Sequence, residues 1–112
     1  MGKYATYRKR GSHAAGPSGL PVPQTPVLGT QDDDLISEQA SIPDPGGTIR
    51  LFFFETEEGE YTQIQGSPPA PLINWSELTV LESGFFKVDQ VGGGTNYAGT
   101  SPRSAPFEYE AP

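Results

Sequence analysis

The segment FKVDQVGGGTNYAGTSPRSAPFEYEAP, residues 86–112, carries the most information about the fold. Apolar and polar residues alternate on both sides of its glycine run, at 86–90 and at 107–110, with the period of two that is typical of β-strands. A phosphate-binding loop would need a helix after the glycines, and Pro102 opposes a helix there. The segment therefore predicts two strands joined by a mobile loop, residues 92–99, which binds no ligand and tolerates Gly93→Ala.

Short β-prone segments recur through the rest of the chain, separated by turn signals. Clusters of Asp, Glu, Pro, Gly and Ser mark turns at 32–34, 43–47, 57–59, 66–69 and 82–84. The segments between them are LISEQASI (35–42), TIRLFFFET (48–56), YTQIQG (61–66), LINWSEL (72–78), FFKVDQV (85–91) and APFEYEA (105–111). Regular short strands with turns between them predict an all-β sandwich or barrel. We expect Phe53, Trp75, Phe86 and Val88 to form its core.

The composition fits one small β domain with a tail. The chain has 112 residues, 12 Pro, 14 Gly and 34% hydrophobic residues, which suits short strands and turns better than helices. It has no cysteine, so disulfides and thiolate metal sites are excluded, which is compatible with assembly in a reducing cytoplasm. No window is apolar enough to span a bilayer and the start lacks the apolar part of a signal peptide, so we expect no membrane association.

Charge divides the chain into a basic arm and an acidic body. Four of the seven basic residues are Lys3, Arg8, Lys9 and Arg10, and no acidic residue precedes Asp32. The rest of the chain therefore holds three basic residues against all fourteen acidic ones, a net charge of −11. We expect residues 1–20 to form an extended basic arm and residues 21–112 to form the folded domain. The segment PVPQTPVLGT (21–30) marks the boundary, as a linker or as a first edge strand interrupted by prolines.

The order of the predicted strands resembles that of a fibronectin type III domain over residues 21–112. The penultimate strand of that family has an aromatic residue two positions before a Val, and a Gly-Thr-Ser-Pro-x-Ser-like segment leads into its last strand. Phe86, Val88 and residues 99–104 stand at matching places. The resemblance implies an all-β, fibronectin type III or immunoglobulin-like sandwich of two sheets, in which residues 92–99 join the last two strands.

The arm combines tyrosines with cations. Its segment YATYRKR (4–10) brings two aromatic rings next to three basic residues, which can hold phosphates while the rings stack on bases. The same residues can dock on an acidic protein surface. The protein surface is favoured, because a body of net charge −11 would repel nucleic acid. The predicted partner-binding residues of the arm are Lys3, Tyr4, Tyr7, Arg8, Lys9 and Arg10.

The run LFFFE (51–55) predicts a second contact surface. If Ile49, Leu51 and Phe53 face the core, Phe52 and Phe54 project from the opposite face of the strand beside Arg50. Two outward aromatic side chains on a small domain favour a docking role. The alternative is that a strand bulge or the N-terminal segment covers them.

Residue patterns for catalysis or metal binding are lacking. The single histidine, His13, lies in the arm without a partner fixed by structure, as a catalytic dyad or triad requires. The run Asp32-Asp33-Asp34 lacks the spacing of a calcium loop and predicts a solvated turn. Glutamates 55, 57, 58 and 60 lie on a predicted hairpin rim rather than across a cleft. We expect no enzyme activity and no cofactor.

These features favour a structural or binding module. A small cysteine-free β domain with a basic arm is similar to small structural proteins of bacteriophage virions, which decorate or cement the capsid or join the tail machinery. The partners would then be other virion proteins in a larger assembly, formed in the host cytoplasm. One alternative is a cell-surface or glycan-binding recognition module, which would use Trp75, Tyr97 and the 92–99 loop. Another is a nucleic-acid binder that uses the arm.

Overall fold

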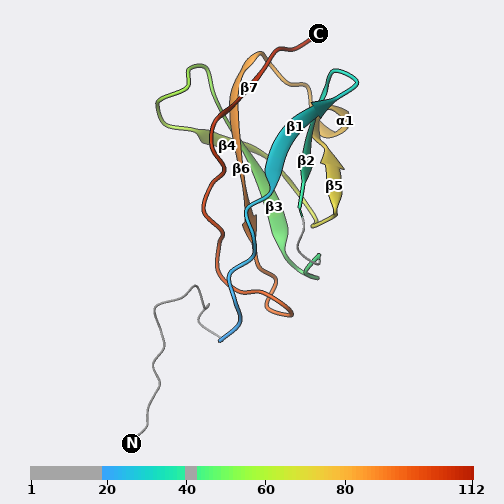
Figure 1. Cartoon of the computed structure of the whole chain (residues 1–112), viewed down its shortest axis with the longest axis vertical. Coiled ribbons are helices and arrows are strands. Elements are labelled where there is room, and N and C mark those ends of the chain that lie inside the picture. Colours follow the sequence, from blue (N-terminus) through green and yellow to red (C-terminus); the bar gives the residue numbers. More distant parts are fainter. Residues whose placement is uncertain (1–18, 40–42) are drawn as a thin grey trace, which may run out of the picture.

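The computed structural model of the chain describes residues 19–39 and 43–112, which form two antiparallel sheets (Figure 1). One sheet contains β1 (Val27–Gln31), β2 (Asp34–Glu38) and β5 (Leu72–Asn74), in that order. The other has the order β4 (Thr62–Ser67), β3 (Thr48–Phe54), β6 (Gly84–Val91) and β7 (Phe107–Tyr109). A single helical turn, α1 (Trp75–Leu78), follows β5. The predicted all-β architecture with two sheets is confirmed.

The core lies between the two sheets and draws side chains from both. Leu28, Leu35 and Ile73 come from the three-stranded sheet, and the four-stranded sheet adds a larger set, namely Ile49, Leu51, Phe86, Val88 and Tyr109. Alternation along β3 and β6 puts Ile49, Leu51, Phe86 and Val88 on the inward face of the four-stranded sheet. The prediction of a core containing Trp75, Phe86 and Val88 is confirmed, because all three are fully buried. Phe53 is only partly buried and packs on Phe86, with ring centroids 5.0 Å apart.

The β1–β2 connection is a two-residue hairpin made of aspartates. Gln31 pairs with Asp34, and the two residues between them, Asp32 and Asp33, have φ values of 52° and 69°. Positive φ at both central residues is the geometry of a type I′ turn, whose twist suits a hairpin. Both side chains are exposed, so the prediction of a solvated turn is confirmed for residues 32–33. Asp34 instead begins β2, is half-buried and accepts a 2.9 Å hydrogen bond from the side-chain amide of Asn74.

The predicted strand at 72–78 is wrong beyond Asn74. The Asn74 side chain accepts a hydrogen bond of 3.2 Å from the backbone N–H of Glu77, which is the N-cap geometry that starts a helix. Trp75 therefore enters the core from α1, where its indole N–H donates to the Ser37 hydroxyl on β2 at 3.0 Å. The cap changes the direction of the chain and thereby decides how this aromatic residue reaches the core.

The last predicted strand is also shorter than expected, because prolines interrupt its approach. Ser101 and Ser104 replace part of the missing ladder: their hydroxyls accept from the backbone N–H groups of Gln90 and Val88, at 3.0 and 2.9 Å. Their own N–H groups donate to the carbonyls of the same two residues at 2.8 Å. The backbone N–H and C=O groups of Val88 and Gln90 at the edge of β6 are thus hydrogen-bonded, although the prolines prevent a regular strand beside them.

Most of the proposed arm is not described by the structure. Residues 1–18 lie outside the described part, and with them all six predicted partner-binding residues of the arm and His13. The division at residue 20 therefore stays a prediction. Within residues 19–39 and 43–112, no helix has the length and apolar character needed to cross a membrane.

Candidate docking face

The outward surface of the four-stranded sheet is the candidate site. Because Ile49 and Leu51 point into the core, the alternate residues of β3 point away from it. The register between β3 and β6 then pairs Arg50 with Asp89, Phe52 with Lys87 and Phe54 with Phe85 on this surface. Tyr61 and Arg103 contact these side chains. We call this set the docking face: Arg50, Phe52, Phe54, Tyr61, Phe85, Lys87, Asp89 and Arg103.

Phe52 points outward as predicted but is not exposed. Only 3% of its surface is accessible, because the guanidinium of Arg103 lies 3.9 Å from the centre of its ring and that of Arg50 lies at 5.2 Å. The pairing of β3 with β4 does shift register between Leu51 and Phe52, as the bulge alternative requires. The groups that lie over the Phe52 ring are nevertheless the two arginines. The expectation of an exposed Phe52 is therefore wrong, and a partner would contact the arginines above the ring.

Phe54 is half-buried beneath the β3–β4 hairpin. Its ring lies 6.0 Å from that of Tyr61, and a Cβ on Gly59 would overlap it. Gly59 therefore allows the hairpin backbone to approach the aromatic ring closely. The Tyr61 hydroxyl donates to the carbonyl of Glu57 at 2.6 Å, which fixes the same hairpin. Burial, and then the charge of Glu57, raise the pKa of Tyr61, so its ring carries a neutral hydroxyl at ordinary pH.

All three basic residues of the body lie on the docking face. Arg50 and Arg103 stack on Phe52, and the ammonium of Lys87 lies 4.4 Å from the centre of the Tyr61 ring. Each cation–π contact is worth about 0.5–1 kcal/mol at an exposed site. The contacts hold the charged groups in defined positions, which reduces the entropy lost when a partner binds.

Arg50 is neutralised within the chain. Its guanidinium donates two hydrogen bonds, of 2.8 and 2.7 Å, to the carboxylate of Asp89, which is only 2% exposed. The hydrogen bonds to Asp89 raise the pKa of Arg50, and burial opposes them only in part. Among residues 19–39 and 43–112 this is the only ion pair. Lys87 and Arg103 therefore carry the uncompensated positive charge of the docking face.

The chemistry of this face suits an acidic group. A guanidinium can bind a carboxylate or phosphate through two parallel hydrogen bonds, and its flat surface remains stacked on the ring. The surroundings are acidic, since Glu108 of β7 stands opposite Phe85 in the register and the hairpin beside Tyr61 carries several glutamates. The result is a small positive area on a negative domain, and it favours a partner that presents a localised acidic patch.

The glycine loop already holds an anion, and the anion belongs to the chain itself. The buried carboxylate of Asp44 accepts backbone N–H bonds from Gly93 at 2.6 Å, Asn96 at 2.6 Å and Tyr97 at 3.1 Å. Converging backbone N–H groups of this kind form an anion-binding nest. The loop is also closed on itself by bonds from Gly92 to Gly99 and from Gly94 to Tyr97, both 2.8 Å. It is a hydrogen-bonded loop and differs from the loose connection expected from its sequence.

The nest determines the protonation of Asp44. Burial raises its pKa, but backbone N–H groups of residues 93 and 95–97 oppose burial and together hold the pKa below its ordinary value of 3.8. The carboxylate is thus ionised at neutral pH and occupies the place that an external phosphate would need. The sequence predicts a turn around Asp44 but carries no signal for this role, because the contact with Gly93 spans 49 residues.

Residues named for the alternative functions are distributed differently. Trp75, expected to contact a glycan in a recognition module, is fully buried and cannot present its ring. Tyr97 is half-buried beside the loop. In the described part of the chain, no group of three or more His, Cys, Asp or Glu side chains is placed to hold a metal ion.

No family model and no curated protein matches this sequence. The function is therefore inferred from the geometry of the domain and its faces.

Proposed function

We propose that the chain is a non-enzymatic structural protein of a bacteriophage virion, which decorates or cements the capsid or joins the tail machinery and is anchored by its N-terminal arm. The observation that carries this proposal is the docking face, where Lys87 and Arg103 are held over aromatic rings on an otherwise acidic domain. Preorganised cations of this kind suit a fixed protein neighbour, because electrostatic complementarity sets orientation and partner choice.

The strand order supports the finer assignment to the fibronectin type III class. When the strands are lettered A, B, C, C′, E, F and G in chain order, A, B and E share one sheet and C′, C, F and G share the other. Immunoglobulin-like sandwiches likewise divide A, B and E from C, F and G, and fibronectin type III domains have this sandwich architecture. Such a domain needs no cofactor to act as a rigid support for binding surfaces.

The position of the first described residues supports a role for the arm as a tether. The carbonyl of Pro21 accepts a 3.0 Å hydrogen bond from the N–H of Ala98, so Pro21 lies at the end of the sandwich that carries the glycine loop. Figure 1 shows the C-terminus at the opposite end. An arm attached there can contact one neighbour while the docking face contacts another.

Co-sedimentation with virions of the phage that encodes the chain tests this function. We expect the full chain to sediment with particles assembled without it, and Arg103→Gln to weaken that attachment, because it removes a charge from the docking face. Glu77→Gln, on the exposed side of α1, is the matched control and should attach like the wild type. An absence of co-sedimentation, or binding to DNA in place of particles, would contradict the proposal.

A further inference from the structure

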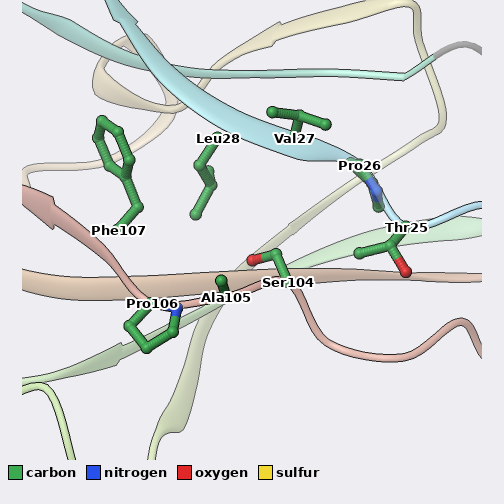
Figure 2. A pocket seen from close by; sticks show the side chains of 8 residues that line it. All are labelled: Thr25, Pro26, Val27, Leu28, Ser104, Ala105, Pro106 and Phe107. Carbon is green, nitrogen blue, oxygen red and sulfur yellow. The ribbon is translucent and has the colours of Figure 1, made fainter.

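An apolar groove lies along the seam where the edges of the two sheets meet (Figure 2). Its walls are the start of β1, with Val27 and Leu28, and the approach to β7, with Ala105, Pro106 and Phe107. The groove has a volume of about 370 Å³. Leu28 is buried, whereas 68% of the Val27 surface is exposed. The exposed Val27 side chain adds apolar surface to the wall of the groove, and a segment that covered it would remove that surface from water.

Each wall includes part of an edge strand. Within the described residues, β1 pairs only with β2, and β7 pairs only with β6. Thr25 donates to the carbonyl of Pro102 at 2.9 Å and ties the two walls together at one end. The free side of β1 offers backbone donors and acceptors to an extended segment, the mode of recognition known as strand addition. The groove is therefore shaped for an extended peptide with small apolar or aromatic side chains.

We propose that this groove receives the N-terminal arm of a second copy of the chain. The inference rests on the proposed function, in which the arm joins neighbouring molecules. Eighteen residues precede Gly19, and an extended chain covers about 3.3 Å per residue, which is enough to reach an adjacent copy. Either Tyr4 or Tyr7 can supply a side chain for the apolar groove, since neighbouring residues of an extended segment point to opposite sides. A tyrosine in the groove thus leaves the adjacent cation, Lys3 or Arg8, pointing out of it.

Charge complementarity favours this occupant. The arm carries four cations and no acidic residue, whereas the body has a net charge of −11. The groove has acidic residues beside both walls: Glu38 stands opposite Val27 in the β1–β2 register, and Glu108 follows Phe107. Both glutamates are exposed. An arm that combines two tyrosines with four cations thus meets an apolar groove with acidic residues nearby.

The placement of Gly19 favours a second copy over the chain's own arm. The described chain starts beside the glycine loop and runs from there along the seam into β1. To reach its own groove, the arm would have to reverse direction close to Gly19 and run back beside β1. An arm from a neighbour needs no such reversal and can enter from either end.

Paramagnetic relaxation between labelled molecules tests the inference, and the lack of cysteine makes the labelling specific. A full chain with Ser12→Cys carries one nitroxide and is mixed with a ¹⁵N-labelled wild-type chain. We expect loss of signal intensity at the amides of Val27, Leu28, Ala105 and Phe107, and a smaller loss at high salt. Val27→Glu in the ¹⁵N-labelled chain should abolish the effect.

The matched control for that substitution is Val80→Glu, since Val80 is 94% exposed and lies outside the groove. This variant should retain the intensity loss at the groove. No loss at the groove amides would overturn the inference. A second experiment places the nitroxide and the ¹⁵N label on the same molecule and dilutes it among unlabelled chains. If the loss of intensity at the groove is seen only in this experiment, the inference is also overturned, because the occupant is then the chain's own arm. Groove contacts without attachment to virions would contradict the proposed function alone, and attachment without groove contacts would contradict this inference alone.

Discussion

Gln90 is a buried polar side chain without a partner, and replacing it should stabilise the domain. The residue lies on the inward face of β6, paired in register with Ile49, and its side chain is fully buried. Within the described residues neither Oε1 nor Nε2 has a hydrogen-bond partner. Its backbone, in contrast, is bonded to Ser101 in both directions. The desolvation cost therefore falls on the amide group alone.

The expected gain follows from the cost of that amide. A buried polar group without a hydrogen bond costs about 1–3 kcal/mol in protein mutational data. Methionine has a similar length and a flexible apolar end that adapts to irregular space. Gln90→Met should thus raise the free energy of unfolding by about 1–3 kcal/mol. For a domain of this size each kcal/mol raises Tm by about 4–8 °C.

Urea and thermal unfolding measure this change, with the fluorescence of the single buried tryptophan, Trp75, as the probe. Gln63→Met is the control, because Gln63 is exposed on β4 and surface substitutions usually change stability by less than about 0.5 kcal/mol. If Gln90→Met unfolds at lower urea concentration than the wild type, the amide has a favourable partner such as a buried water, and the reasoning is refuted.

Three further changes test the packing around the core and the loop. Ser37→Ala should destabilise the domain by about 1–3 kcal/mol, since it leaves the buried indole N–H of Trp75 unpaired; an unchanged urea midpoint would contradict this. Gly93→Ala should lower Tm or prevent folding, contrary to the tolerance expected from the sequence, because its Cβ would overlap the backbone of the 43–47 turn. Gly29→Ala, with no atom within 4 Å of the new Cβ, is the control, and equal Tm values for the two variants would disprove the clash. Because the fold lowers the pKa of Asp44, ionisation of this carboxyl stabilises the domain at pH values above its ordinary pKa of 3.8, and the contribution is lost as pH falls through the lower folded-state pKa. Asp44→Asn should therefore lower Tm at neutral pH and make Tm fall less steeply in acid. If Tm of the variant falls in acid like that of the wild type, other groups cause the acid sensitivity.

The sequence was sufficient to predict those parts of the fold that depend on local alternation. The inward residues of β3 and β6 repeat every second position, so the buried Leu51, Phe86 and Val88 could be assigned to one face before their partners were known. The strand expected at 72–78 failed because a single side chain, Asn74, caps a helix there. A capping hydrogen bond outweighs the weak β preference of a short segment.

The docking face could be predicted only in part, because some of its residues lie far apart in the sequence. The alternation of β3 correctly indicated that Phe52 points outward, but its cover comes from Arg103, which lies far along the chain in the irregular segment before β7. No periodic pattern links the two residues. The role of Lys87 also depends on the β3–β6 register, which is set by the packing of the whole sheet.

The buried anion in the glycine loop is linked to Pro21, next to the point where the proposed arm would begin. Asp44 binds the backbone of Gly93 and Tyr97, and Ala98, the next residue, donates to the carbonyl of Pro21. Hydrogen bonds on two successive residues of the loop, Tyr97 and Ala98, thus connect the ionised carboxylate and Pro21 to the same backbone. A rigid base limits the directions that a tether can take, which reduces the entropy lost when the tether binds. The close backbone contacts that require glycine at 92 and 93 therefore serve the proposed tether, since they allow the carboxylate to be enclosed and the loop to hold the incoming chain.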